Sequence, residues 1–338
     1  MTRNLDIENR IQWIDWMKAI LMLLIVWGHF FPHHVSKYIY AVNVPLFFFI
    51  SGYLQKPIDT WKQWWSKQWR TLLMPYLLLS VIRLIIYYGC NSDELSFVSV
   101  SKSVCLVLGG WHSYGAIPGC GELWFVYALF VARLLYQIMH QYPIVHGVLT
   151  GMLFVFVGWY GKASHYGLDL WSVQTLPLIY PVFYLGTCKS VKRILGNEYV
   201  WWKLLLAILC ALPTFYYATR GQGAAMVFIA NYGANYGANY GHYILGVLCG
   251  IVIVFTLSCL MTRCVFVYKP IYVVSIGTLF ILAFHYKIIE LIKDYQLCIS
   301  GNYIIDSLLF SMLIIIASIP CIMLVMKYIP WIIGRSRK

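Results

Sequence analysis

Charged residues are scarce in this chain. Asp, Glu, Lys and Arg make up 11% of its 338 residues, whereas soluble domains carry roughly 25%. Apolar residues (Ala, Val, Ile, Leu, Met, Phe, Trp, Tyr and Cys) make up 61%. A disordered chain is excluded, because disorder requires low hydrophobicity. An ordinary water-soluble enzyme is excluded too, since a single core of this size cannot hide so much apolar surface.

Patterns that bind metals or nucleotides are missing as well. The ten cysteines form no CxxC pair and no zinc-type cluster with histidine, and the chain has no P-loop and no Ser–His–Asp order. We therefore expect no metal cofactor. No cleavable signal peptide precedes the first apolar run. Cys90, Cys105 and Cys120 flank one loop. If that loop faces an oxidising side, two of these cysteines could form a disulfide.

Long apolar runs dominate what is present. The mean hydropathy is +0.72, and the runs are about 17–22 residues long, which is the length of a membrane-spanning helix. Strands of a membrane barrel would instead alternate over about 10 residues. We predict an all-α, polytopic helical membrane bundle with about ten transmembrane helices in a single domain, 1–338. The predicted spans are 14–33, 37–54, 71–90, 121–139, 143–160, 172–188, 200–219, 242–261, 271–291 and 303–327.

The basic residues are distributed unevenly about these spans. Lys and Arg number 25 against 12 Asp and Glu, which gives a net charge of +13. With the N-terminus inside, the inner segments hold 17 of the Lys and Arg and the outer ends 6, and the other two, Arg83 and Arg133, fall within spans. Basic residues stay on the cytoplasmic side, so both termini are predicted in the cytoplasm, in a bacterial-type inner membrane. A nucleic-acid partner is not expected, because the charges are spread over many loops.

Two segments between spans are unusual. Residues 56–70 interleave four tryptophans with Lys62, Lys67 and Arg70. They suit either a helix that lies in the inner membrane interface or a simple flank with an aromatic belt. Residues 230–241 repeat Ala-Asn-Tyr-Gly three times, which is typical of a flexible outer loop.

Ionisable groups inside hydrocarbon are costly, so each is a candidate functional residue. The first span carries Lys18 and His29, eleven residues apart. This spacing places both on one helix face, about 16 Å apart along the axis. Asp15 lies one turn before Lys18 and can pair with it. A desolvated imidazole stays neutral, which is the form that a general base needs.

Further ionisable groups fall within or beside the spans, among them His285, Glu122 and Arg83. His285 in the ninth predicted span and Glu122 at the start of the fourth both lie in the outer half of the membrane, like His29. We predict that His29, Glu122 and His285 meet at one depth near the outer leaflet; the alternative for Glu122 is a carboxylate facing water at a helix N-terminus. Arg83 lies in mid-span and needs a partner or a watery cavity.

Five motifs in the same order resemble the acyltransferase-3 family of integral membrane O-acyltransferases. A basic residue, ten intervening residues and a histidine match that family's first helix, and the second span matches its P-L-F-F-x-x-S-G-[FY]-L signature. The short chain looks most like the subgroup of fucose-O-acetylase-like and exopolysaccharide acyltransferases. The matching positions are Lys18 and His29; 43–54; Arg70 with 74–76; 123–125; and Ser275 through His285.

The resemblance implies O-acyl transfer, most often of acetyl from cytoplasmic acetyl-CoA or another acyl-CoA, to a hydroxyl of a cell-surface or lipid-linked glycan outside. His29 would act as base or accept the acyl group first, and Glu122 or His285 would orient it or bind the sugar. The CoA phosphates would meet the cations of the inner face, Lys18, Lys62, Lys67 and Arg70.

Two other functions stay open from the residues alone. A multi-span glycan or lipid transporter, or a flippase component, could also use intramembrane His and Arg. A non-catalytic membrane partner in envelope assembly is the other. Acyl transfer from labelled acetyl-CoA in proteoliposomes separates all three.

The basic asymmetry predicts the topology. Single reporter cysteines placed in 56–70 and 189–203 should react only with reagent from the cytoplasmic side. Those placed in 91–120 and 222–241 should react from outside. Protection of the Ala-Asn-Tyr-Gly loop from external reagent would overturn the predicted span count.

Overall fold

The structure is a computed structural model that describes residues 10–112, 117–160, 169–171, 173–197, 200–220 and 240–335. Most of the tandem repeat at 230–241 lies outside these residues. Within them the chain is almost wholly helical, which confirms the all-α class. Short strands β1 (Trp111–His112) and β2 (Asp169–Leu170) pair antiparallel. The α-helices are α1 (Gln12–Gly28), α2 (Ser36–Tyr40), α3 (Asn43–Leu54), α4 (Trp61–Gln68), α5 (Met74–Cys90), α6 (Phe97–Gly109), α7 (Trp124–Met139), α8 (Pro143–Tyr160), α9 (Leu176–Thr187), α10 (Lys189–Leu195), α11 (Trp201–Thr219), α13 (Tyr240–Met261), α14 (Tyr268–Ile276), α15 (Thr278–Asp294) and α16 (Tyr303–Tyr328).

Several helices are long and apolar, as in an integral membrane protein. Among the described residues, five are long and apolar enough to cross a membrane, or six if α14 and α15 count as one broken span. This count does not confirm the predicted ten. The five are Trp61–Cys90, Gly121–Met139, Trp201–Thr219, Gly241–Met261 and Tyr303–Tyr328.

Two spans that the sequence predicts as single helices are broken. The segment 271–291 divides at Gly277, and its two parts, α14 and α15, are bent by 82°. A Cβ on Gly277 would lie 2.3 Å from the Ile322 side chain of α16. The absence of a side chain on Gly277 therefore lets α16 pack closely against the bend. The segment 37–54 divides into the five-residue α2 and the longer α3. Segment 91–120, predicted as a loop, contains α6.

The Trp-rich segment is continuous with the following span. α4 runs through a π-helical turn, Trp69–Leu73, directly into α5. Trp64 is fully buried, whereas Trp61, Trp65 and Trp69 are about half exposed. An amphipathic helix with exposed tryptophans suits the membrane interface.

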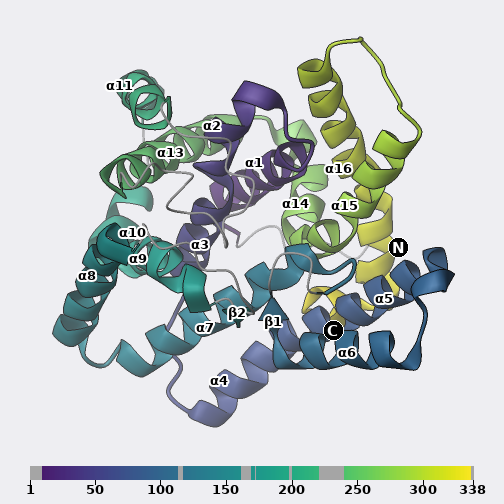
Figure 1. Cartoon of the computed structure of the whole chain (residues 1–338). Helices are drawn as coiled ribbons and strands as arrows, with labels where there is room; N and C mark the ends of the chain where they lie inside the picture. The colour runs from purple at the N-terminus through teal and green to yellow at the C-terminus, as the bar shows by residue number, and fades with distance from the viewer. Residues whose placement is uncertain are drawn as a thin grey trace.

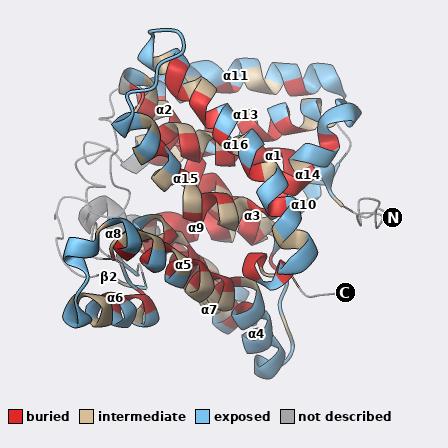
Figure 2. Cartoon of the chain, turned by 90° about the vertical axis from the view of Figure 1, so that its right-hand side faces the viewer, coloured by how far each residue is buried: buried red, intermediate tan, exposed pale blue. Residues whose placement is uncertain are grey.

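α1 lies at the centre of the bundle. It packs against α3, α13, α14, α15 and α16, and Figure 1 shows it between α13 on one side and α14 and α16 on the other. Buried residues gather along these central helices in Figure 2, whereas α11 and α4 are largely exposed. Exposed apolar side chains such as Leu209 on α11 and Ile316 on α16 are 64% and 60% accessible. Such faces suit lipid, which is as apolar as the side chains themselves.

α3 and α9 make a close helix contact that depends on glycine. A Cβ on Gly52 of α3 would lie 1.9 Å from the carbonyl oxygen of Phe183, and one on Gly186 of α9 would lie 2.2 Å from that of Phe49. Small residues at facing positions let two membrane helices approach closely. The glycine of the Ser-Gly pair in the second-span motif is therefore explained by close helix packing. The same contact holds α3 beside the central cavity.

Substitution of either glycine should loosen this contact. Gly52→Ala and Gly186→Ala should each lower the free energy of unfolding by about 1–3 kcal/mol, the usual cost of overpacking. A Cβ on Gly89 of α5 would have no atom within 4 Å, so Gly89→Ala is the matched control and should be neutral. Thermal unfolding in detergent measures all three. Equal melting temperatures for the Gly52→Ala and Gly89→Ala proteins would contradict the packing argument.

Candidate active site

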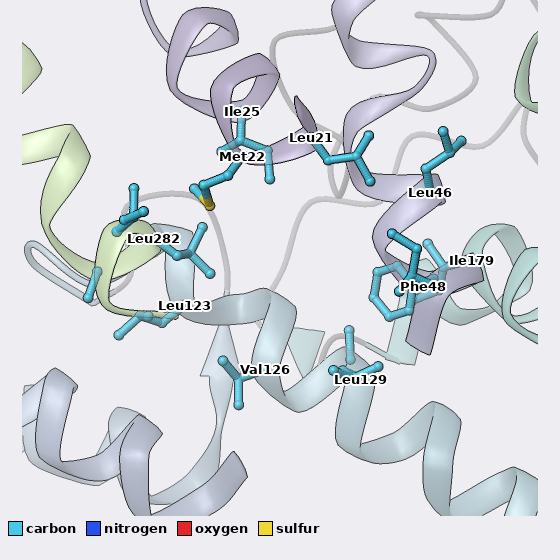
Figure 3. Packing of buried hydrophobic residues seen from close by; sticks show 14 of the residues in the cluster. Leu21, Met22, Ile25, Leu46, Phe48, Leu123, Val126, Leu129, Ile179 and Leu282 are labelled. Carbon is cyan, nitrogen blue, oxygen red and sulfur yellow. The ribbon is translucent and has the colours of Figure 1, made fainter. Parts of the chain in front are cut away.

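One large cavity runs through the centre of the bundle. Its volume is about 690 Å³, within the range of sites for small ligands and cofactors. Residues of α1, α3, α7, α14 and α15 line it, together with the turn before α7 and the C-terminal end. Figure 3 shows how buried apolar side chains of these helices lie relative to one another, and four of those it labels, Met22, Ile25, Leu129 and Leu282, line the cavity.

α1 supplies one wall of the cavity with a polar group at each end. Lys18, Met22, Ile25 and His29 all line the cavity, and their spacing of four, three and four residues makes a single helical stripe. The stripe carries an ammonium at one end and an imidazole about 16 Å away at the other. The predicted common face of Lys18 and His29 is therefore a wall of this cavity.

α7 and its preceding turn supply a matching wall. Glu122, Phe125, Leu129 and Arg133 line the cavity, and Glu122 and Arg133 are again eleven residues apart, about 16 Å along the axis. Arg133 lies within electrostatic range of Lys18. The two walls therefore place cations together at one end, called here the Lys18 end, and leave Glu122 toward the other, the His29 end.

His29 and His285 are in direct contact at the His29 end. His285 Nε2 lies 3.0 Å from His29 Nδ1, although the two residues are 256 positions apart in the chain. His285 is 1% exposed, and its Nδ1 lies 2.9 Å from the Ile281 carbonyl oxygen and 3.0 Å from that of Leu282. The structure thus brings together two of the predicted site histidines.

When both imidazoles are neutral, the hydrogen bonds of this pair define which nitrogen of each ring carries the hydrogen. A carbonyl oxygen only accepts, so His285 Nδ1 carries the hydrogen and its Nε2 is an acceptor. His29 Nδ1 lies 2.9 Å from the Ile25 carbonyl oxygen and therefore also carries a hydrogen, which it directs at both Ile25 and His285. The remaining nitrogen of His29, Nε2, holds a lone pair and makes no hydrogen bond with the described residues.

Glu122 is held by Arg83 of α5. The Arg83 guanidinium donates through Nε to the Gly119 carbonyl oxygen, and its Nη2 lies 3.8 Å from Glu122 Oε2. Arg83 is 3% exposed and the Glu122 side chain 11%, so the carboxylate is not simply facing water. Its Oε2 atom is buried and has no hydrogen-bond partner among the described residues. Arg83 also lies within electrostatic range of His285, which connects Glu122 to the histidine pair.

The Lys18 end gathers four cations. Arg10, Lys18, Arg133 and Arg335 line it, and Lys18 lies within electrostatic range of the other three. Arg133 donates to Ser51 Oγ at 3.1 Å and to Gln68 Oε1 at 3.4 Å. In the part of the chain that the structure describes, it has no carboxylate partner.

The expected Asp15–Lys18 pair is not formed. Asp15 accepts instead from Arg10, at 2.5 and 2.9 Å, and from Tyr268 and Ser275 of α14, at 2.8 and 2.5 Å. The bend of the ninth predicted span brings α14 across α1, and its hydroxyls then fill the remaining acceptor sites of the carboxylate. Lys18 makes no hydrogen bond or salt bridge with a described residue.

Three of the predicted donor-binding cations lie away from the cavity. Lys62, Lys67 and Arg70 are exposed on the segment that leads into α5, and none of them lines the cavity. The Arg70 Nε donates to the Ser66 carbonyl oxygen of its own helix at 3.2 Å. Arg133 is not among the predicted site residues, although its eleven-residue spacing from Glu122 repeats that of Lys18 and His29.

All ten cysteines lie among the described residues, and each is a free thiol. Cys90 and Cys105 are exposed free thiols, and Cys120 is a buried one whose sulfur faces the Ser80 carbonyl oxygen at 3.6 Å. Across the described ranges, no three His, Cys, Asp or Glu side chains group as metal ligands.

Comparison with protein families gives one result. A family model described as an acyltransferase domain, that of the acyltransferase-3 family, matches residues 11–327. This match covers nearly the whole chain, so the chain belongs to that family. No curated protein and no solved structure matches the chain.

Proposed function

We propose that this member of the acyltransferase-3 family moves an acyl group, with acetyl as the first choice, from cytoplasmic acyl-CoA to a hydroxyl of a cell-surface or lipid-linked glycan outside. One observation carries the proposal: a single cavity joins a cluster of cations to a histidine with a free lone pair, about 16 Å apart. A polyanionic donor and a polar acceptor can therefore reach the same reaction centre from opposite ends.

The Lys18 end suits the donor. CoA carries phosphates, and guanidinium groups bind phosphate through charge-assisted and often bidentate hydrogen bonds. Lys18 and Arg133 face the cavity there without a carboxylate partner among the described residues. Lys62, Lys67 and Arg70, exposed on the neighbouring segment, remain candidates for the part of the donor that extends beyond the cavity.

His29 is the proposed catalytic base. Its Nε2 lone pair takes the proton of the acceptor hydroxyl as the hydroxyl oxygen attacks the thioester carbonyl carbon. The carbon–sulfur bond then breaks, and the thiolate takes the proton back from the imidazolium. If the acyl group passes through the protein instead, the same lone pair attacks the acyl carbon and the carbon–sulfur bond breaks to release the thiolate. The acceptor oxygen then attacks this acyl carbon, the nitrogen–acyl bond breaks, and the thiolate takes the hydroxyl proton. General-base help is typically worth about 10²–10⁴ in rate.

His285 and Asn43 are proposed to support this step. His285 accepts the Nδ1 hydrogen of His29 and so keeps Nε2 unprotonated, a role that a carboxylate has in hydrolase triads. Asn43 lines the cavity, and its Oδ1 accepts from the Val44 N–H at 2.7 Å. Its Nδ2 therefore remains to donate. A Cβ on Gly28 would lie 3.6 Å from this Nδ2, so the amide is beside α1 one residue before His29, where it could stabilise the oxyanion.

The His29 end suits a sugar. Phe31, Tyr40, Trp124 and Tyr286 line it, and aromatic rings offer flat apolar faces to a sugar ring. Glu122 lines the same region, and its buried oxygen can accept from a sugar hydroxyl. The basic asymmetry of the loops supports an outer position for this end and cytoplasmic termini in a bacterial-type inner membrane.

Loss of the His29 imidazole should abolish transfer but spare the donor. The His29→Ala protein in proteoliposomes should transfer acetyl from labelled acetyl-CoA at least about 10²-fold more slowly. Its affinity for CoA should not change, because the donor phosphates would lie about 16 Å away. His34→Ala, an exposed histidine five residues further on, is the matched control and should keep full activity. Near-normal turnover of a folded His29→Ala protein would remove His29 from the mechanism.

Substitution of His285 should impair the orientation of His29 without weakening the binding of acetyl-CoA. His285→Leu removes the acceptor of the His29 Nδ1 hydrogen, so kcat should fall on the order of tenfold, the value of one buried hydrogen bond. KM for acetyl-CoA should stay constant. His285→Gln presents an amide oxygen and should restore most of kcat. A Leu variant with normal kcat, or a Gln variant as slow as the Leu variant, would contradict the orienting role.

A further inference from the structure

The two ends of the described chain meet at one buried tyrosine, Tyr272. The guanidinium carbon of Arg10 lies 5.0 Å from the centre of the Tyr272 ring, and that of Arg335 lies 5.8 Å from it. Arg335 also donates to the Tyr272 hydroxyl at 3.4 Å. Tyr272 is 1% exposed, and both arginines line the Lys18 end of the cavity. Arg10 and Arg335 are therefore positioned around a shared, buried aromatic anchor.

The C-terminal segment is fixed in place by packing and by a turn. The 3₁₀ turn Pro330–Ile333 packs against α5, α15 and α16, and Ile333 is buried and lines the cavity. Gly334 follows in the left-handed region, at φ 73°, and a Cβ there would lie 2.8 Å from the Thr71 carbonyl oxygen. Only glycine fits this conformation and this contact. The turn thus delivers the next residue, Arg335, to the cavity.

The cations at this end are only partly neutralised. Arg10 is paired with Asp15 at 2.5 Å, and that carboxylate is saturated by further hydrogen bonds from α14. Lys18, Arg133 and Arg335 have no salt bridge with any described residue. Unpaired charges in a membrane bundle are costly, so three of them lining one cavity indicate a site for a ligand with several negative charges.

We propose that residues 330–335, which lie beyond the residues matched by the family, complete a diphosphate-binding site, with Arg335 as a ligand beside Lys18 and Arg133. The ligand class is the nucleotide diphosphate of an acyl donor, so this inference rests on the proposed function. Arg335 reaches the cavity from the C-terminal turn, on a different wall from α7, which carries Arg133. A phosphate-bearing lipid headgroup is the other source of the same chemistry.

Binding of CoA to Arg335 variants in nanodiscs of zwitterionic phosphatidylcholine tests the proposal. Arg335→Gln keeps a donor for Tyr272 but removes the charge, and it should raise the Kd for CoA at least about tenfold, as expected for a hydrogen bond to a charged group. Arg335→Lys should give an intermediate Kd. Arg133→Gln provides a second, independent variant and should show a similar loss. Arg193→Ala, an exposed arginine of α10, is the matched control and should bind CoA like the unchanged protein.

The outcomes separate this site from the transfer reaction. Weakened CoA binding in a folded Arg335→Gln protein supports the site even if the unchanged protein transfers no acetyl group, since that result counts against the proposed function alone. Unchanged CoA binding in Arg335→Gln overturns the site. Addition of phosphatidylglycerol to the nanodiscs tests the lipid source. A phosphatidylglycerol effect on melting temperature that disappears in Arg335→Gln, with CoA binding unaffected, assigns the arginine to a headgroup and overturns the proposal.

Discussion

A charge inside a membrane bundle must be paired, hydrogen-bonded or placed on a cavity that water or a ligand can fill. The polar residues of this chain satisfy that constraint in all three ways. Asp15 is paired with Arg10 and bound by two hydroxyls of α14. Arg83 is held by the Gly119 carbonyl and lies near Glu122. Lys18 and Arg133 have no carboxylate partner among the described residues and instead face the central cavity. The cations without a carboxylate partner therefore depend on the cavity for water or a ligand, and they give the cavity its polar lining.

The two walls of the cavity explain how it joins different chemistries. α1 carries two polar residues eleven positions apart on one face, α7 with its preceding turn carries another such pair, and apolar side chains fill the stripe between them. The arrangement gives an apolar channel with polar ends about 16 Å apart. Cations gather at one end, and imidazoles with a carboxylate gather at the other. An extended apolar group such as an acyl chain suits the apolar middle, and charged or hydroxylated groups suit the ends.

Close helix packing and helix breaks hold these walls in position. The glycine contact between α3 and α9 brings the second-span motif against the cavity, and Asn43 and Ser51 of α3 line it as a result. The break at Gly277 turns α14 across α1, where Ser275 and Tyr268 bind Asp15. It also allows α15 to point His285 at His29. A straight ninth helix could not serve both contacts, because its two halves meet α1 from different directions.

The sequence by itself determined the helical membrane class and the family motifs, and it predicted the depth of the ionisable groups. Apolar run length and the rise of 1.5 Å per residue depend only on local geometry. From these two quantities, His29, Glu122 and His285 are predicted to lie at one depth in the membrane. The contact between the two histidines is consistent with this prediction. The tertiary structure alone decided the partners. Asp15 pairs with Arg10 and not with Lys18, Arg133 joins the cation cluster, and Arg335 arrives from the far end of the chain. Such contacts join helices that are distant in sequence, and the bends and glycine contacts that bring those helices together leave no periodic signal in the residues themselves.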